Sequence, residues 1–256
     1  ACIDQPIVRE MLERLRLRRN GRRLITYGQN SDADMVLLDA FVDGQQTTFN
    51  AKFSDRVGGG ARAIMDWRVP IPGRHNALNA LAAIAVAAEA GIPDETIKAA
   101  LETFSGVKRR YQPTGEWQGV RIFDDYGHHP IEIEAVLRAS RSGTEGSIIA
   151  VVEPHRYSRV KDLFPDFCRC FKSADHVVVI PLYSAGDAPL DGISSQALAE
   201  GIRAQSGKEA ATVDTVQELA AHLRDIAKSG DVIVCLGAGY STEWAHALPG
   251  ALAGGD

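Results

Sequence analysis

Basic charge and long apolar runs are both scarce in this sequence of 256 residues. Lys and Arg number 28 against 33 Asp and Glu, and the net charge of -5 leaves no basic field to attract nucleic acid. The best apolar run, "ALNALAAIAVAAEAG" at 77–91, is interrupted by Asn79 and Glu89, and it falls short of the roughly 18 to 20 residues that a membrane helix needs. We therefore expect neither nucleic-acid binding nor membrane insertion.

Cysteine is rare and scattered, at Cys2, Cys168, Cys170 and Cys235. This pattern fits a reducing compartment better than a disulfide framework. Residue 1 is Ala rather than Met, and the first helical pattern begins without a cationic and apolar leader. We expect the chain to be a piece of a longer protein.

A phosphate-binding loop is also missing. The nearest match, "GIRAQSGKEA" at 201–210, has one residue too many between its glycines and has Glu209 where Ser or Thr should hold magnesium. It also ends a helical pattern instead of following a strand. We interpret the match as chance.

The second half of the chain alternates short apolar runs with amphipathic helical patterns. Strands are predicted at 120–123, 147–152, 176–180, 210–213 and 231–236, with helices starting near Pro130, Val160, Ser194 and Asp214 and a last one after "GAGYSTEW". Such alternation is typical of a mostly parallel sheet covered on both faces. Residues 109–256 are predicted to form an α/β, Rossmann-like, doubly wound domain.

The first half differs in character. Its pattern predicts a short helix at about 6–16 and a strand at 23–28. Two further runs, at 34–42 and 45–53, alternate apolar and polar residues as strands do, and Asp43-Gly44 between them is a hairpin signal. Two helices follow, one from "PGRHNALNA" and one after Pro93. This half has too few parallel strands for a doubly wound sheet, so we expect its hairpin and helices to need a partner.

Polar side chains follow the predicted strands of the second half, where ligands collect in open α/β sheets. "DDYGHHP" follows the strand at 120–123, "EPHRYSR" follows 147–152 and "LGAGYS" ends the strand at 231–236. Arginines at such an edge, here Arg156 and Arg159 beside His155, suit a carboxylate or a phosphate because their donors form a planar fork. The alternative is that they are solvated surface charges.

The double histidine has three interpretations. His129 either caps the helix that begins at Pro130 or, with His128, faces a ligand or binds a metal. A metal pair is disfavoured because neighbouring side chains point apart and the sequence offers no third ligand at a zinc-like spacing. The "GAG" stretch at 237–239 is either a tight turn or a phosphate cradle.

Polar residues also mark the helix that opens at "PGRHNALNA". Asn76 and Asn79 are three apart and so share one helix face. Asn76 alone would be explained as an N-cap, whereas Asn79 in an Ala-rich helix costs stability unless its amide is used. "GVKRRYQ" places Arg109 and Arg110 near the change of character at residue 107, facing a nucleotide or water.

Five segments together resemble the Mur ligases, the ATP-dependent amide-forming enzymes of peptidoglycan precursor synthesis. They are "PGRHNALNALAAIAVAAEAGI", "FSGVKRRYQPTGE", "DDYGHHPIEIEAVLRA", "PHRYSRVKDLF" and "PLYSAGDAPLDGISSQAL". The resemblance extends over nearly all of residues 1–248. It implies that 1–108 are the last part of a central ATP-binding domain and that 109–256 are the C-terminal domain that brings the amino acid, in a bacterial cytoplasmic enzyme.

The resemblance also implies which residues meet the nucleotide. His75, Asn76 and Asn79 match positions at the adenine. Arg110 is expected to reach the ATP phosphates, and Asp125 is expected to hold the ribose.

A second group matches positions around the amino acid and the muramyl carboxylate, namely Tyr126, His128, Arg156 and Arg159. Arg110, His128 and Arg156 are the residues expected to act in catalysis. No residue of the chain is expected to bind a metal, because the ligands of Mg²⁺ and the phosphate loop would lie before residue 1.

The implied reaction is acyl activation. ATP would phosphorylate the lactyl carboxylate of UDP-N-acetylmuramate, and the amine of L-alanine would attack the acyl phosphate. The chain by itself is expected to be inactive. Two alternatives stay open: the recycling ligase of the family, which joins a tripeptide to the same sugar, and a nucleotide-binding module without catalysis.

Two positions depart from the family's pattern. Glu153 stands where Gln is more usual before "PHR". Pro165 interrupts the helical pattern around "DLF", so we expect that helix to start late or to kink.

Overall fold

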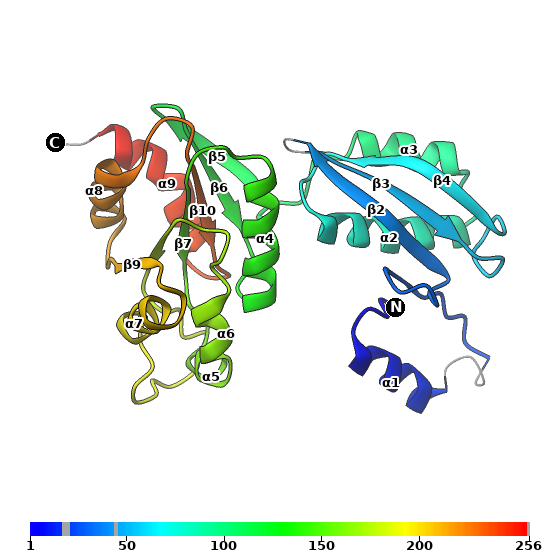
Figure 1. Ribbon diagram of the computed structural model, residues 1–256, viewed down its shortest axis with the longest axis horizontal. Helices are drawn as coiled ribbons and strands as arrows, with labels where there is room; N and C mark the ends of the chain where they lie inside the picture. Colours follow the sequence, from blue (N-terminus) through cyan, green and yellow to red (C-terminus); the bar gives the residue numbers. More distant parts are fainter. Residues whose placement is uncertain (17–20, 44–45, 255–256) are drawn as a thin grey trace. The chain divides into compact units, whose positions relative to one another are not determined.

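The computed structural model describes residues 1–16, 21–43 and 46–254. The chain divides into two compact units, Ala1–Ser105 (unit 1) and Gly106–Asp256 (unit 2) (Figure 1). Each unit has its own sheet. None of the helices in the described part of the chain combines the length and the apolar composition needed to span a bilayer.

Unit 1 contains a four-stranded sheet of order β1-β2-β3-β4. Its strands are β1 (Tyr27–Gly28), β2 (Met35–Asp43), β3 (Gln46–Phe53) and β4 (Arg62–Val69). β1 runs parallel to β2, and the other pairs are antiparallel. The predicted hairpin is confirmed by the pairing of Asp43 with Gln46, while Gly44 in its turn lies outside the described residues.

The strand predicted at 23–28 is shorter than expected. Only Tyr27 and Gly28 form strand β1 beside β2, and the side chains just before them bond to polar partners. The N–H and the hydroxyl of Thr26 both donate to the buried carboxylate of Asp34, at 2.8 Å each, and Arg23 donates to Glu89.

The sheet of unit 1 packs against two of its three described helices, whereas the first helix buries no side chain, so the expected need for a further partner stays a prediction. The helices are α1 (Pro6–Leu15), α2 (Arg74–Glu89) and α3 (Asp94–Glu102). Leu81 and Ile84 of α2 are buried against the sheet, in one core with Phe49 and Trp67, whose rings stack with centroids 6.3 Å apart. Apolar side chains from both layers thus supply the driving force for this packing.

Unit 2 contains a six-stranded sheet of order β5-β6-β10-β7-β8-β9. The strands are β5 (Gln112–Trp117), β6 (Val120–Asp125), β7 (Ile148–Val152), β8 (His176–Val179), β9 (Glu209–Thr212) and β10 (Val232–Leu236). All neighbours are parallel except β5, which pairs antiparallel with β6 at the edge. The five predicted strands are present, and β5 is an addition to them.

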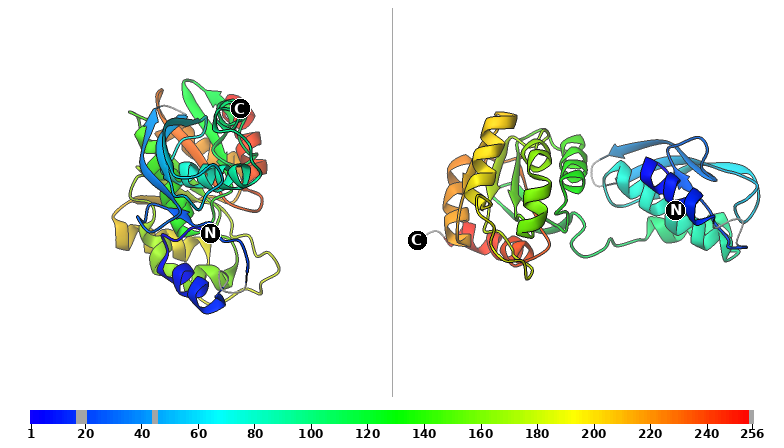
Figure 2. Two further views of the ribbon diagram at one scale, coloured as in Figure 1. Left: turned by 90° about the vertical axis from the view of Figure 1, so that its right-hand side faces the viewer. Right: turned by 90° about the horizontal axis from the view of Figure 1, so that it is seen from below.

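Helices cover both faces of this sheet, as Figure 2 shows. The helices are α4 (Pro130–Ser142), α5 (Tyr157–Asp162), α6 (Phe164–Arg169), α7 (Ser195–Ser206), α8 (Val216–Ile226) and α9 (Ser241–Ala253). Successive residues of β7 point to opposite faces of the sheet. Ile148 and Ala150 pack with α4 to α7, whereas Ile149 and Val151 pack with α8 and α9. The predicted α/β class, with a doubly wound and mostly parallel sheet, is confirmed.

Pro165 breaks the helix after β7, as expected. The pattern predicted as one helix near Val160 is two short helices, with Leu163 between α5 and α6 and Pro165 in the first turn of α6. Proline is tolerated there because the first N–H groups of a helix have no intrahelical partner.

The two faces of β2 and β3 lead to a prediction for unit 1. Phe49 is 0% exposed in the core, whereas Phe41 on the opposite face is 64% exposed. Phe49→Ala should lower the free energy of unfolding of unit 1 by about 3–5 kcal/mol, and Phe41→Ala should change it by about 0.5 kcal/mol or less. Native-state hydrogen exchange resolved by peptide measures both, with unit 2 as internal reference. Equal losses in the two variants would mean that the buried face is assigned wrongly.

Candidate functional site

The candidate site lies at the carboxyl ends of the three central strands of unit 2. Asp125 at the end of β6 lies opposite Leu236 of β10, which lies opposite Val152 of β7. The chain leaves these strands through the segments 126–129, 237–240 and 153–156. The predicted residues of "DDYGHHP" and "EPHRYSR" are therefore brought to one sheet edge.

Asp125 is held within the loop that it begins. Its carboxylate is 2% exposed and accepts hydrogen bonds from the N–H groups of Tyr111 at 2.8 Å and Gly127 at 2.7 Å. Burial raises the pKa of Asp125 to about 6, against the opposing effect of these two N–H groups and of Arg110. The carboxylate thus organises the backbone around Tyr126.

The two neighbouring arginines have different surroundings. Arg109 donates to the carbonyl oxygen of Gly237 at 2.8 Å, and its Nε lies 3.5 Å from the buried carboxylate of Asp124. Arg110 is exposed, with its guanidinium 5.8 Å from the ring centroid of Tyr126. Arg109 therefore ties the loop to the end of β10, whereas the side chain of Arg110 is open to a ligand.

His129 begins helix α4 as its N-cap. Its Nδ1 accepts from the N–H of Ile131 at 3.3 Å, and the Glu132 carboxylate accepts from the N–H groups of His128 and His129 at 3.2 Å each. This arrangement satisfies N–H groups that the first turn of a helix leaves open. The capping interpretation of His129 is confirmed.

Five rings from four loops form a continuous row at this edge. They are Tyr126, His128, His155, Tyr183 and Tyr240, with successive centroids 5.3, 5.1, 5.2 and 5.0 Å apart. Tyr183 and Tyr240 were not predicted as site residues. The rule applied to the other strands would have found Tyr183, because "PLYSAGD" directly follows β8.

His155 sits in the middle of this row as a neutral ring. Burial lowers its pKa to about 4, and the neighbouring His128, Arg159 and Arg156 lower it further. Its Nδ1 lies 3.5 Å from Nη1 of Arg159 and can accept from it when the proton is on the other ring nitrogen.

Arg156 and Arg159 line a hollow of about 390 Å³ with His129, Ser158, Asp162 and Leu163. Arg156 has a positive φ of 68°, a conformation that costs a non-glycine residue about 1–3 kcal/mol and persists only where the surroundings hold it. The hollow thus has two guanidinium groups, a setting suited to a carboxylate.

Backbone N–H groups in and after the "GAG" stretch that follows β10 donate to a carboxylate of the same chain. Glu153, which is 1% exposed, accepts from the N–H of Gly239 at 2.6 Å and from that of Ser241 at 2.9 Å, at the start of α9. Burial raises the pKa of Glu153, while these N–H groups oppose the shift. Because a carboxylate of the protein occupies this helix start, the stretch is a turn and not a phosphate cradle. Glu153, one of the two positions that depart from the family's pattern, thereby contacts this motif.

The three predicted residues of unit 1 lie in the first turns of α2. Helix α2 begins at Arg74 with Gly73 as N-cap, so Asn76 is inside the helix and not its cap. Asn76 donates to the carbonyl oxygen of Pro72 at 2.8 Å, and Asn79 donates to Oδ1 of Asn76 at 3.3 Å, which confirms their shared face. Asn79 is exposed, so its amide pays no cost of burial and the argument from burial does not hold. His75 is half-buried beside them.

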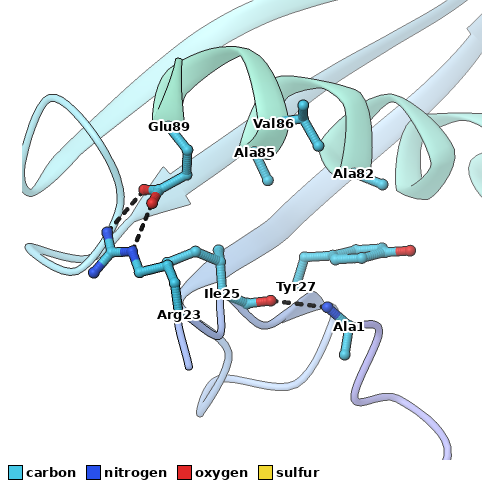
Figure 3. A pocket seen from close by; sticks show the side chains of 8 residues that line it. All are labelled: Ala1, Arg23, Ile25, Tyr27, Ala82, Ala85, Val86 and Glu89. Carbon is cyan, nitrogen blue, oxygen red and sulfur yellow. Dashed lines mark hydrogen bonds and ion pairs between the residues drawn. The ribbon is translucent and has the colours of Figure 1, made fainter. Parts of the chain in front are cut away.

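A second hollow of about 390 Å³ lies elsewhere in unit 1 (Figure 3). Ala82, Ala85 and Val86 of α2 line it, and the ion pair of Arg23 with Glu89 at 2.6 Å closes one end. His75, Asn76 and Asn79 are not among its lining residues. Within the residues that the structure describes, no three His, Cys, Asp or Glu side chains are grouped as a metal site requires.

Comparison with known families accounts for both units. Residues 109–239 match the model described as Mur ligase, glutamate ligase domain, and residues 2–87 match the Mur ligase middle domain. The first match alone spans more than half of the chain. The chain therefore belongs to the Mur ligase family, which confirms the resemblance seen in its motifs.

Individual relatives agree with this assignment. UDP-N-acetylmuramate--L-alanine ligase of Azorhizobium caulinodans is 51% identical over 98% of this chain, and the match covers 53% of that protein. The crystal structure of UDP-N-acetylmuramate-alanine ligase from Thermotoga maritima has a TM-score of 0.69 at 25% identity, over 88% of this chain and 46% of that one. MurF ligase from Thermotoga maritima, solved with ADP, shares the fold with a TM-score of 0.68 at 19% identity, over 98% and 52%. The chain spans about half the length of the curated relatives that it matches.

The raised pKa of Asp125 leads to a prediction about pH. The acid has a pKa of 3.8 when free and of about 6 when folded. The folded state therefore binds more protons than the unfolded state between these values, and stability falls as pH rises. The contribution of Asp125 to the free energy of unfolding should drop by about 2 kcal/mol from pH 4 to pH 7.

The test compares Asp125→Asn, which removes the titration, with the wild-type chain in urea unfolding across that range. The difference between the two should change with pH by about this amount, and carbon-13 NMR should show the Asp125 carboxyl titrating near pH 6. A titration near pH 4 would contradict the prediction.

Proposed function

We propose that this chain forms part of an ATP-dependent ligase that joins L-alanine to UDP-N-acetylmuramate through an acyl phosphate. The observation that carries the proposal is the 51% identity, over nearly the whole chain, to a relative with that name. The proposed place is a bacterial cytoplasm. Residues 1–108 would belong to the ATP-binding part and residues 109–256 to the part that brings the amino acid.

The proposed amino-acid site is the edge with Arg156, Arg159, His128 and Tyr126. Two guanidinium groups beside one hollow can bind the carboxylate of L-alanine through charge-assisted hydrogen bonds. The neutral His155 adds no charge to this group. His128 and Tyr126, on the neighbouring loop, would contact the amino acid and the muramyl carboxylate.

The proposed nucleotide contacts follow the resemblance. His75, Asn76 and Asn79 would meet the adenine, with amides that can both donate and accept. Asp125 would hold the ribose, and its two bonds to backbone N–H groups fix the carboxylate in place. A related ligase of this fold was solved with ADP, which supports a nucleotide substrate.

Charge neutralisation is the chemistry that these residues can supply. Arg110, exposed at the start of unit 2, would neutralise charge on the transferred phosphoryl group. Mg²⁺ would assist by binding the phosphate oxygens. The described residues lack a grouped set of three His, Cys, Asp or Glu ligands, so we assign no residue of this chain to the metal.

The decisive assay uses a polypeptide of the relatives' full length that contains this chain. It should form UDP-N-acetylmuramoyl-L-alanine and ADP only when ATP, L-alanine and UDP-N-acetylmuramate are all present. The 256-residue chain alone should form none. Preference for a tripeptide over L-alanine in competition would instead indicate the recycling ligase.

Arg156 and Arg110 should have separable effects in that polypeptide. Loss of a charge-assisted hydrogen bond to the substrate carboxylate should make Arg156→Ala raise the KM for L-alanine by roughly 10- to 150-fold, with much less change in the KM for ATP. Arg110→Ala should mainly lower kcat, because it acts on the phosphoryl step. Arg138→Ala, exposed on α4, is the control. An unchanged alanine KM in folded Arg156→Ala would show that the 153–159 loop does not bind the amino acid.

A further inference from the structure

Helix α5 begins without a capping hydrogen bond from its own N-cap residue, Arg156. Arg156 occupies the N-cap position, and its side chain makes no capping hydrogen bond with the described part of the chain. Short polar residues are preferred at this position because their oxygen accepts from the N–H of the second or third helical residue. Helix α5 therefore needs a cap from another segment.

Asp187, in the loop after β8, supplies that cap. Its Oδ2 accepts from the N–H of Ser158 at 3.1 Å and from the Ser158 hydroxyl at 2.6 Å. Its Oδ1 lies 3.9 Å from Nη1 of Arg156. The hydroxyl and N–H of Ser158 lower the pKa of Asp187, and the charges of Arg156 and Arg159 assist. One carboxylate thus caps the helix start and lies beside the guanidinium.

The backbone places Asp187 where it can do this. The loops after β7 and β8 pair as parallel chains, with the N–H of Arg156 donating to Tyr183 at 2.8 Å and the N–H of Tyr183 donating to Pro154 at 2.9 Å. A turn then brings the N–H of Asp187 to the carbonyl oxygen of Ser184 at 2.9 Å. Asp187 therefore sits at the end of a turn fixed to the loop that carries Arg156.

We propose that Asp187 is the positioning residue for the arginines of the 153–159 loop, holding Arg156 and, through α5, Arg159 toward the carboxylate of the amino acid. The proposal rests on the proposed function. Asp187 does not itself meet the substrate, because its oxygens face Ser158 and Arg156.

The test uses the 256-residue chain with three substitutions. Asp187→Asn keeps an oxygen that can accept from Ser158 but removes the charge beside Arg156. Asp187→Ala removes both. Asp191→Asn, exposed four residues further along the same loop, is the matched control.

Two measurements are made on each variant that folds. Nitrogen-15 NMR follows the Ser158 amide and the Arg156 Nε–Hε signal, and an L-alanine titration gives Kd. Asp187→Asn should shift the Arg156 signal and weaken L-alanine binding by about two- to fivefold, as loss of a partly exposed ion pair predicts. Asp187→Ala should also shift the Ser158 amide, and Asp191→Asn should match the wild type.

The outcomes separate this proposal from the proposed function. If the Arg156 signal or the Kd for L-alanine is unchanged in folded Asp187→Asn, positioning by Asp187 is wrong. A purely structural role would lower the melting temperature and leave both unchanged. If the wild-type chain binds no L-alanine, the proposed amino-acid site is wrong in this chain, and the NMR signals alone then decide whether Asp187 holds Arg156.

Discussion

The insertion of β10 between β6 and β7 is the constraint on which the candidate site depends. β10 is the last of the described strands in the sequence, yet it pairs with both β6 and β7 in the middle of the sheet. Arg109 bonds to Gly237 only because β10 ends beside β6, and Glu153 reaches Gly239 only because it ends beside β7. The polar edge is therefore assembled only when nearly all of unit 2 has folded, since non-local pairing must precede it.

Buried carboxylates do most of the organising at that edge. Asp125 and Glu153 are ionisable groups in largely apolar surroundings, where a charge is costly unless hydrogen bonds compensate it. Each accepts from two backbone N–H groups, so the same bonds that offset the burial also set the course of the loops. Exposed side chains such as Arg110 and Tyr126 lie on loops whose backbone is fixed by these buried carboxylates.

Sequence reasoning succeeded where local pattern and burial agree. The runs at 147–152 and 231–236 predict buried strands because all but the first residue of each is apolar, and the polar residues that follow them lie at the edge that forms the candidate site. The strand β5 was missed because "QPTGEW" contains Pro and Gly, and its pairing is decided by the neighbouring strand. The ring row and the partnership of Asp187 with Ser158 depend on which loops are neighbours. That follows from strand order, which no local pattern encodes.

The edge strand β5 has a consequence for how this protein behaves in concentrated solution. Sheet edges with unpaired N–H and C=O groups invite strands from other molecules and so promote aggregation. In β5, Pro113 lacks an N–H and the register shifts between Pro113 and Gly115, which interrupts the row of bonding groups. Gly115 also lies so close to α9 that an added Cβ would be 2.6 Å from Pro249. Pro113 and Gly115 give β5 a low strand propensity. The same two residues make it a suitable edge strand, because they hinder the pairing of a strand from another molecule with this edge.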